Sequence, residues 1–141
     1  MKKKGLFLII LISSIYFIYS YNISRFNKTT SSERNTENVV IDVLEEGVGS
    51  PAEVGSIVKI HYKASLEDGT IFDSSYERNM PFKFKLGTKA VLKGLNESVL
   101  GMKKGGKIKV IIPPKLGFKS HTLGGLVPPD SFLFFEIERV E

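Results

Sequence analysis

The feature that most constrains the fold is an alternating run of residue types that ends in a tight turn. In "IVKIHYKASLEDGT", which begins at Ile57, apolar residues alternate with residues that are mostly charged. The apolar members are Val58, Ile60, Tyr62, Ala64 and Leu66. Such a run predicts a strand with one face against a core and the other in water. Asp68-Gly69 then supplies a strong hairpin signal, so the chain is expected to turn back as an antiparallel neighbour.

Further strands and one helix are predicted in the rest of the domain. The strand segments are "VVIDVLEEG", "TIFDSS", "PFKFKLG", "KIKVIIPP" and "SFLFFEIERV". Helical spacing is shown by Leu92, Leu95, Val99 and Met102. Gly105 is expected to end this helix. One short helix among five or six strands that are joined by turns predicts an α+β domain with an antiparallel sheet.

The N-terminal part of the chain is expected to lie outside this domain. Residues 1–21, "MKKKGLFLIILISSIYFIYSY", join a basic start to an apolar run, as in a cleaved signal peptide or an uncleaved membrane anchor. Under both alternatives the lysines stay in the cytoplasm, so the remainder is expected to be exported. Residues 22–38 are polar and predict a flexible tether, which leaves residues 39–141 as the folded domain.

Composition and motifs exclude several functional classes. The formal net charge is +5, but residues 1–38 hold six basic and two acidic residues, which leaves about +1 for the domain. A surface that binds nucleic acid needs a concentrated basic field, so nucleic acid is not expected as a partner. The absence of cysteine excludes disulfides, thiolate nucleophiles and zinc–thiolate sites. The sequence carries no hydrolase or metalloprotease motif, and His61 is expected on the charged face of its strand.

The segment "GTIFDSSYERNMPFKFKLG" instead gathers aromatic residues around one acid. It contains Phe72, Phe82 and Phe84, and Asp73 directly follows the first of them. One reaction needs such a surface without a nucleophile, base or metal. Rotation about an X-Pro peptide bond breaks no covalent bond, and its barrier of roughly 18–20 kcal/mol comes from amide resonance. Because a twisted amide is less dipolar than a planar one, a dry aromatic site binds it better than the ground state.

Three segments of the domain resemble the FKBP-type peptidyl-prolyl cis-trans isomerases. They are "VKIHYKASLEDGTIFDSSYERNMPFKFKLG", "VLKGLNESVLGMKKGGKIKVIIPP" and "LVPPDSFLFFEIE", in the order and spacing of the family. The resemblance implies a five- to six-stranded antiparallel sheet curled around one short helix, with a proline site between them. It also implies that no cofactor is needed. Proline-containing polypeptides, and macrolides such as tacrolimus or rapamycin, are the ligands it implies.

The resemblance also implies which residues form the site. The expected catalytic residues are Tyr62, Phe72, Asp73, Phe82 and Phe135. The expected substrate-binding residues are Val91, Leu92, Leu95, Phe118 and Val127. By the same resemblance, Asp73 is held by the hydroxyl group of Tyr62 and does not donate a proton, and the backbone N–H of Leu92 holds a substrate carbonyl.

The chain departs from the family pattern at four places. Leu95 stands where the family commonly has a tryptophan at the base of the site, and Phe118 stands where a tyrosine hydroxyl usually bonds the ligand. Lys119 replaces a glycine within a loop, "KSHTLGG", that lacks the common His-Pro-Gly sequence, and Ala90 replaces a frequent glutamate. These changes bear on rate, sequence preference and macrolide affinity more than on the reaction.

Two functions follow as expectations. The first is an isomerase that acts on X-Pro bonds of proteins outside the cytoplasm and so assists their folding. The alternative is a proline-binding or chaperone-like module with little catalytic turnover. A monomer is expected, because the sequence indicates no repeat, second domain or dimerisation helix.

Overall fold

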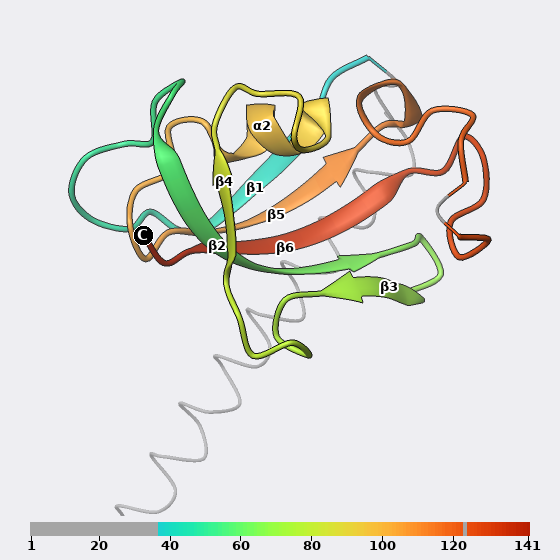
Figure 1. Cartoon of the computed structure of the whole chain (residues 1–141), viewed down its shortest axis with the longest axis horizontal. Helices are drawn as coiled ribbons and strands as arrows, with labels where there is room; N and C mark the ends of the chain where they lie inside the picture. The colour runs from blue at the N-terminus through green and yellow to red at the C-terminus, as the bar shows by residue number, and fades with distance from the viewer. Residues whose placement is uncertain (1–36, 123) are drawn as a thin grey trace, which may run out of the picture. The chain divides into compact units, whose positions relative to one another are not determined.

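A computed structural model describes residues 37–122 and 124–141 of the chain. Within these residues, six strands form one antiparallel sheet, and α2 (Lys93–Val99) is the only α-helix. The strands are β1 (Val40–Glu45), β2 (Ile57–Ser65), β3 (Ile71–Ser74), β4 (Phe82–Lys85), β5 (Lys107–Ile112) and β6 (Leu133–Arg139). A short 3-10 helix, η1 (Pro114–Leu116), follows β5. The predicted α+β class is confirmed, and the helix lies across one face of the curved sheet (Figure 1).

The strand β2 organises the sheet because it is long enough to pair with three neighbours. The order of strands is β1-β5-β6-β2-β3, and β4 pairs with the first half of β2 on the same edge as β3. The predicted alternation holds along β2, with Val58, Ile60, Tyr62 and Ala64 buried. The hairpin at Gly69 holds as well, since the φ angle there is 87° and the N–H of Gly69 donates to the carbonyl of Leu66.

The helix is shorter than the sequence predicts. It ends at Val99, so Met102 and Gly105 lie beyond it. Gly101 adopts a φ of 82°, and its N–H donates to the carbonyl of Ala52 over 2.8 Å. The N–H of Ala52 in turn donates to the carbonyl of Met102. Backbone pairing with a distant segment therefore replaces the last helical turn, and local residue spacing does not report such pairing.

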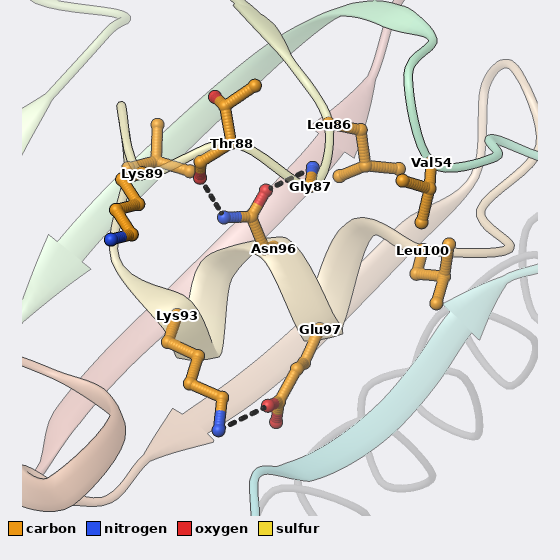
Figure 2. Close-up of a pocket in the computed structure, with 10 residues that line it drawn as sticks. Val54, Leu86, Gly87, Thr88, Lys89, Lys93, Asn96, Glu97 and Leu100 are labelled. Atoms are coloured by element: carbon orange, nitrogen blue, oxygen red, sulfur yellow. Dashed lines mark hydrogen bonds and ion pairs between the residues drawn. The ribbon is translucent and has the colours of Figure 1, made fainter.

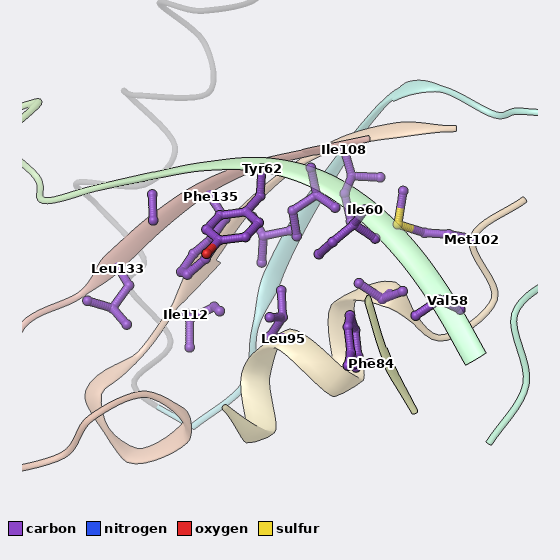
Figure 3. Close-up of a cluster of buried hydrophobic side chains, with 14 of the residues drawn as sticks. Val58, Ile60, Tyr62, Phe84, Leu95, Met102, Ile108, Ile112, Leu133 and Phe135 are labelled. Carbon is purple, nitrogen blue, oxygen red and sulfur yellow. The ribbon is translucent and has the colours of Figure 1, made fainter. Parts of the chain in front are cut away.

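The core lies between the helix and the concave face of the sheet. Leu95 on α2 faces apolar side chains from β2, β5 and β6 (Figure 3). A Cβ at Gly94 would lie 2.4 Å from a methyl group of Ile112, so glycine at this position permits the close approach of helix and sheet.

The predicted signal or anchor and the tether lie outside the described residues, apart from the last two positions of the tether. Within residues 37–122 and 124–141, no helix is long and apolar enough to cross a membrane.

Candidate active site

Five aromatic rings meet at one end of the core, and we call them the aromatic group. They are Tyr62, Phe72, Phe82, Phe118 and Phe135. They come from β2, β3, β4, the loop after η1, and β6, so the group depends on the tertiary fold. Tyr62 and Phe135 are buried, whereas the other three are half-buried. The group therefore has buried rings at its base and partly accessible rings around them.

The rings contact one another mostly edge to face. The centroid of Tyr62 lies 6.0 Å from that of Phe82 and 5.9 Å from that of Phe135. The centroid of Phe72 lies 6.4 Å from that of Phe135 and 6.3 Å from that of Phe118. Edge-to-face pairs at these separations are favourable beyond the area they bury. The contacts thus fix the rings before any ligand arrives.

The remaining apolar residues of the predicted site surround the same core. Leu95 and Val127 are almost fully buried, while Val91 and Leu92 are partly buried against the core cluster. Leu92 immediately precedes the first residue of α2 and has a φ of −53° and a ψ of 143°. Among the hydrogen bonds between described residues, none has the N–H of Leu92 as its donor. This N–H is therefore a candidate donor to a substrate carbonyl.

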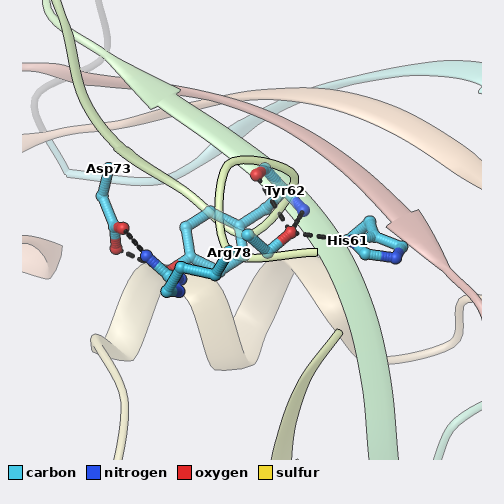
Figure 4. A network of polar contacts seen from close by, with 5 residues as sticks. His61, Tyr62, Asp73 and Arg78 are labelled. Carbon is cyan, nitrogen blue, oxygen red and sulfur yellow. Dashed lines mark hydrogen bonds and ion pairs between the residues drawn. The ribbon is translucent and has the colours of Figure 1, made fainter. Parts of the chain in front are cut away.

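A polar network lies beside the aromatic group (Figure 4). The hydroxyl of Tyr62 donates to Oδ2 of Asp73 over 2.5 Å. The guanidinium of Arg78 donates to Oδ1 of Asp73 over 2.5 Å and to the Tyr62 hydroxyl over 2.8 Å. The guanidinium carbon also lies 5.7 Å from the centre of the Tyr62 ring, within the range of a cation–π contact. Both oxygens of Asp73 are thus held by donors.

The electrostatics of this network keep Asp73 ionised. Burial alone would raise the pKa of Asp73, but the hydrogen bonds from Tyr62 and Arg78 and the charge of Arg78 outweigh it and lower the pKa below its ordinary value. Burial, followed by the hydrogen bond to Asp73, raises the pKa of Tyr62. At neutral pH a neutral tyrosine therefore donates to a carboxylate, and Asp73 has no proton to give to a substrate.

Arg78 is not among the site residues that the sequence indicates. The one available signal is the position of Arg78 five residues after Asp73. The segment before β4 folds back, because the N–H of Met80 bonds the carbonyl of Ser75. This fold brings the guanidinium of Arg78 within hydrogen-bond distance of the Asp73 carboxylate.

The segment that carries Arg78 is attached to the sheet through Ser75 and Tyr76. The buried hydroxyl of Ser75 accepts from the N–H of Tyr62 over 2.8 Å and lies 3.0 Å from Nδ1 of His61. The ring of Tyr76 stacks on His61 with centroids 4.6 Å apart, and its hydroxyl donates to Glu138 over 3.4 Å. His61 thus contacts this segment and lies outside the aromatic group.

Replacing Arg78 with alanine is expected to raise the pKa of Asp73, because the burial that opposes ionisation remains while two favourable contributions are lost. A lowered pKa in the folded state stabilises the fold above about pH 4, and this stabilisation is lost as pH falls through the folded-state pKa. The variant should therefore lose less stability on acidification than the wild type. NMR titration of the Asp73 carboxyl carbon in the full chain measures the shift.

Lys83→Ala is the matched control for this prediction. It removes an exposed positive charge on β4 and should leave the pKa of Asp73 unchanged. Equal titration of Asp73 in the wild type and Arg78→Ala would contradict the role of Arg78 in the network.

Comparison with known proteins assigns the family. Residues 48–140 match the family model described as FKBP-type peptidyl-prolyl cis-trans isomerase. The chain is 44% identical over 103 residues to an FK506-binding protein of Neisseria meningitidis serogroup B, covering 73% of this chain and 94% of that protein. It is 43% identical over 102 residues to FK506-binding protein 1 of Dictyostelium discoideum, covering 72% and 95%.

A solved structure supports the same assignment. The crystal structure of AtFKBP13 superposes with a TM-score of 0.68 at 35% sequence identity, covering 73% of this chain and 91% of that one. The chain therefore belongs to the FKBP-type peptidyl-prolyl cis-trans isomerase family, as the resemblance of its three segments predicts.

Proposed function

We propose that the aromatic group binds the proline of an X-Pro segment and accelerates its cis–trans isomerisation. The main support for this proposal is that partly accessible rings of the aromatic group lie next to the carboxylate of Asp73, whose two oxygens both already accept hydrogen bonds. Such a site offers an apolar surface with a fixed charge and no free proton donor. The roles of the individual residues are part of the proposal.

The proposed mechanism needs no covalent step. The proline ring lies against Phe72, Phe82 and Phe135, where the less dipolar twisted amide is favoured over the planar ground state. The N–H of Leu92 donates to a carbonyl of the substrate and holds the chain on one side of the rotating bond. Asp73 and Arg78 keep Tyr62 in place. Rotation about the C–N bond then follows from differential binding of the transition state.

We further propose that macrolides such as tacrolimus bind at the aromatic group, and that Phe118 lowers their affinity. Two relatives are named as FK506-binding proteins, and the ring of Phe118 contacts Phe72 in the group. Phe118→Tyr restores a hydroxyl that can form one more hydrogen bond. One net bond is worth about 0.5–1.5 kcal/mol, so the Kd for tacrolimus should fall roughly 2- to 13-fold. Isothermal titration calorimetry measures this change.

Phe134→Tyr serves as the control for this substitution. Phe134 lies on β6, next to Phe135 in sequence, and is not part of the aromatic group. The control should leave the Kd of tacrolimus unchanged. If both variants bind with the affinity of the wild type, the hydroxyl at position 118 does not meet the ligand.

A proline-binding module with little turnover is the second candidate. Leu95 and Phe118 favour it, because an aliphatic base and a missing hydroxyl give fewer fixed contacts to a twisted amide. Proline-limited refolding of an unfolded protein separates the two. An enzyme accelerates refolding when its concentration is a small fraction of the client concentration. A binding module affects refolding only near equimolar amounts, and it delays refolding because the bound client must first be released. No acceleration at any ratio would contradict the enzyme.

We also propose that the domain acts outside the cytoplasm, as the basic and apolar start of the chain favours. Fusion of the full chain to a reporter enzyme that requires disulfide bonds tests the location, since such bonds form outside the cytoplasm. An active reporter is expected. A full-length fusion protein that accumulates with an inactive reporter would contradict export.

A further inference from the structure

A hollow separate from the aromatic group lies between α2, the loop after β4 and the segment before β2 (Figure 2). We call it the helix groove. Its volume is about 450 Å³, and none of the five rings of the aromatic group lines it. Its apolar walls are formed by Val54, Leu86, Val91 and Leu100. This volume falls within the range of pockets that hold organic ligands.

The walls of the groove are fixed by hydrogen bonds. Asn96 on α2 clamps the loop after β4, because its Oδ1 accepts from the N–H of Gly87 over 2.8 Å and its Nδ2 donates to the carbonyl of Thr88 over 2.7 Å. Across the groove, the N–H of Gly55 donates to the carbonyl of Leu86 over 2.9 Å. The groove therefore exists without a ligand, and the polar atoms of Asn96 are already engaged.

Large apolar side chains remain exposed at the groove. Val54 is 72% exposed and Leu100 is 50% exposed. Lys93 and Glu97 on α2 also line the groove and pair with each other over 3.8 Å. The surface of the groove is thus chiefly aliphatic. The two charges on the helix are paired with each other, and among the described residues Lys89 is the one further charged residue that lines the groove. The chemistry of the groove suits an apolar side chain more than an ion.

The groove adjoins the proposed proline site through Val91 and Leu92. Val91 lines the groove, and Leu92, the next residue, carries the candidate donor to a substrate carbonyl. Both residues pack against the core cluster that contains Tyr62 and Phe135. A polypeptide whose proline lies on the aromatic group can therefore continue over this ridge into the groove.

We propose that the helix groove is a second subsite for the client polypeptide, which receives an aliphatic or aromatic side chain a few residues from the X-Pro bond. This inference rests on the proposed function. It gives the domain a preference for unfolded chains over short peptides, because only a longer segment spans both sites. The occupant is the same chain that carries the proline.

Three variants of the full chain test the subsite. Val54→Asp and Leu100→Asp place a charge in the groove, and Val48→Asp is a matched control at a valine that is 75% exposed and does not line it. All three positions are at least half exposed, so each variant should fold. Isomerisation is measured on an Ala-Leu-Pro-Phe peptide and on the proline-limited refolding of an unfolded protein.

The groove variants should raise KM for the unfolded protein about fivefold to tenfold, as expected from losing the partial burial of one large aliphatic group. They should leave kcat for that protein and both constants for the tetrapeptide unchanged. Val48→Asp should change neither substrate. Unchanged KM values in both groove variants, or an equal loss on the tetrapeptide, would overturn the proposal.

Binding separates a failure of the groove from a failure of the proposed function. If the wild type catalyses neither reaction, fluorescence anisotropy of a labelled unfolded protein still reports the groove, and Val54→Asp should weaken binding where Val48→Asp does not. Equal binding of the unfolded protein by Val54→Asp and Val48→Asp would overturn the proposed subsite. Sedimentation tests whether a second copy of the chain occupies the groove instead. If the wild type self-associates, and Val54→Asp abolishes this association without changing client binding, the groove is an interface between copies and the proposal is overturned.

Discussion

Phe135→Leu is expected to lower kcat/KM for a Leu-Pro peptide by about tenfold to hundredfold while the domain stays folded. Phe135 is buried and contacts both Tyr62 and Phe72, so its loss removes two ring pairs and one wall of the proposed proline site. Each pair is worth about 0.5–1.5 kcal/mol beyond the buried area, and about 1.4 kcal/mol corresponds to a factor of ten in rate. Peptide isomerisation kinetics and circular dichroism of the full chain provide the measurement.

Phe84→Leu is the matched control for this loss. Phe84 is also a strand phenylalanine, and both residues are 6% exposed. It stacks on Phe82 but lies outside the aromatic group. Both variants should lose similar stability, while Phe84→Leu should keep most of the activity. An equal loss of activity in the two variants would show that general core packing, and not the aromatic group, sets the rate.

Gly47→Ala is expected to destabilise the domain by about 3–5 kcal/mol, which is large compared with most substitutions of this size. Gly47 has a φ of 71°, and a Cβ there would lie 2.6 Å from both the amide nitrogen of Gly106 and the carbonyl oxygen of Lys104. Both are backbone atoms, and the Lys104 carbonyl also accepts from the N–H of Val48, which holds the loop after β1 against the turn before β5. Strained backbone and a forced contact each cost about 1–3 kcal/mol. Denaturant unfolding of the full chain measures the loss.

Gly49→Ala separates the contact from the backbone strain. Gly49 has a similar φ of 84°, but a Cβ there would meet nothing within 4 Å. The control should therefore cost only about 1–2 kcal/mol, the cost of a left-handed conformation. Equal losses at the two positions would mean that close packing around Gly47 contributes nothing to stability.

The sheet could be predicted from the sequence because its signals are local. Alternation along β2 reports which side chains face the core, and Asp68-Gly69 reports where the chain turns. The end of α2 could not be predicted in this way. Gly101 leaves the helix because its backbone pairs with Ala52, and no pattern within the helix segment contains that information.

The site also has features that the sequence indicates and features that depend on the tertiary fold. The resemblance names the residues that the fold gathers around one core, including the hydrogen bond from Tyr62 to Asp73. It does not name Arg78, whose position depends on how the segment before β4 folds back. The helix groove was also missed, because Val54 and Leu100 are 46 residues apart in sequence and meet only through tertiary pairing.

Peptide isomerisation by the full chain tests whether the aromatic group catalyses rotation about X-Pro bonds. Leu-Pro and Ala-Pro peptides are used with and without tacrolimus. We expect relaxation to become faster than the uncatalysed process, which takes tens to hundreds of seconds, and tacrolimus to abolish the acceleration. A folded chain that leaves relaxation at the uncatalysed rate would contradict catalysis by the aromatic group.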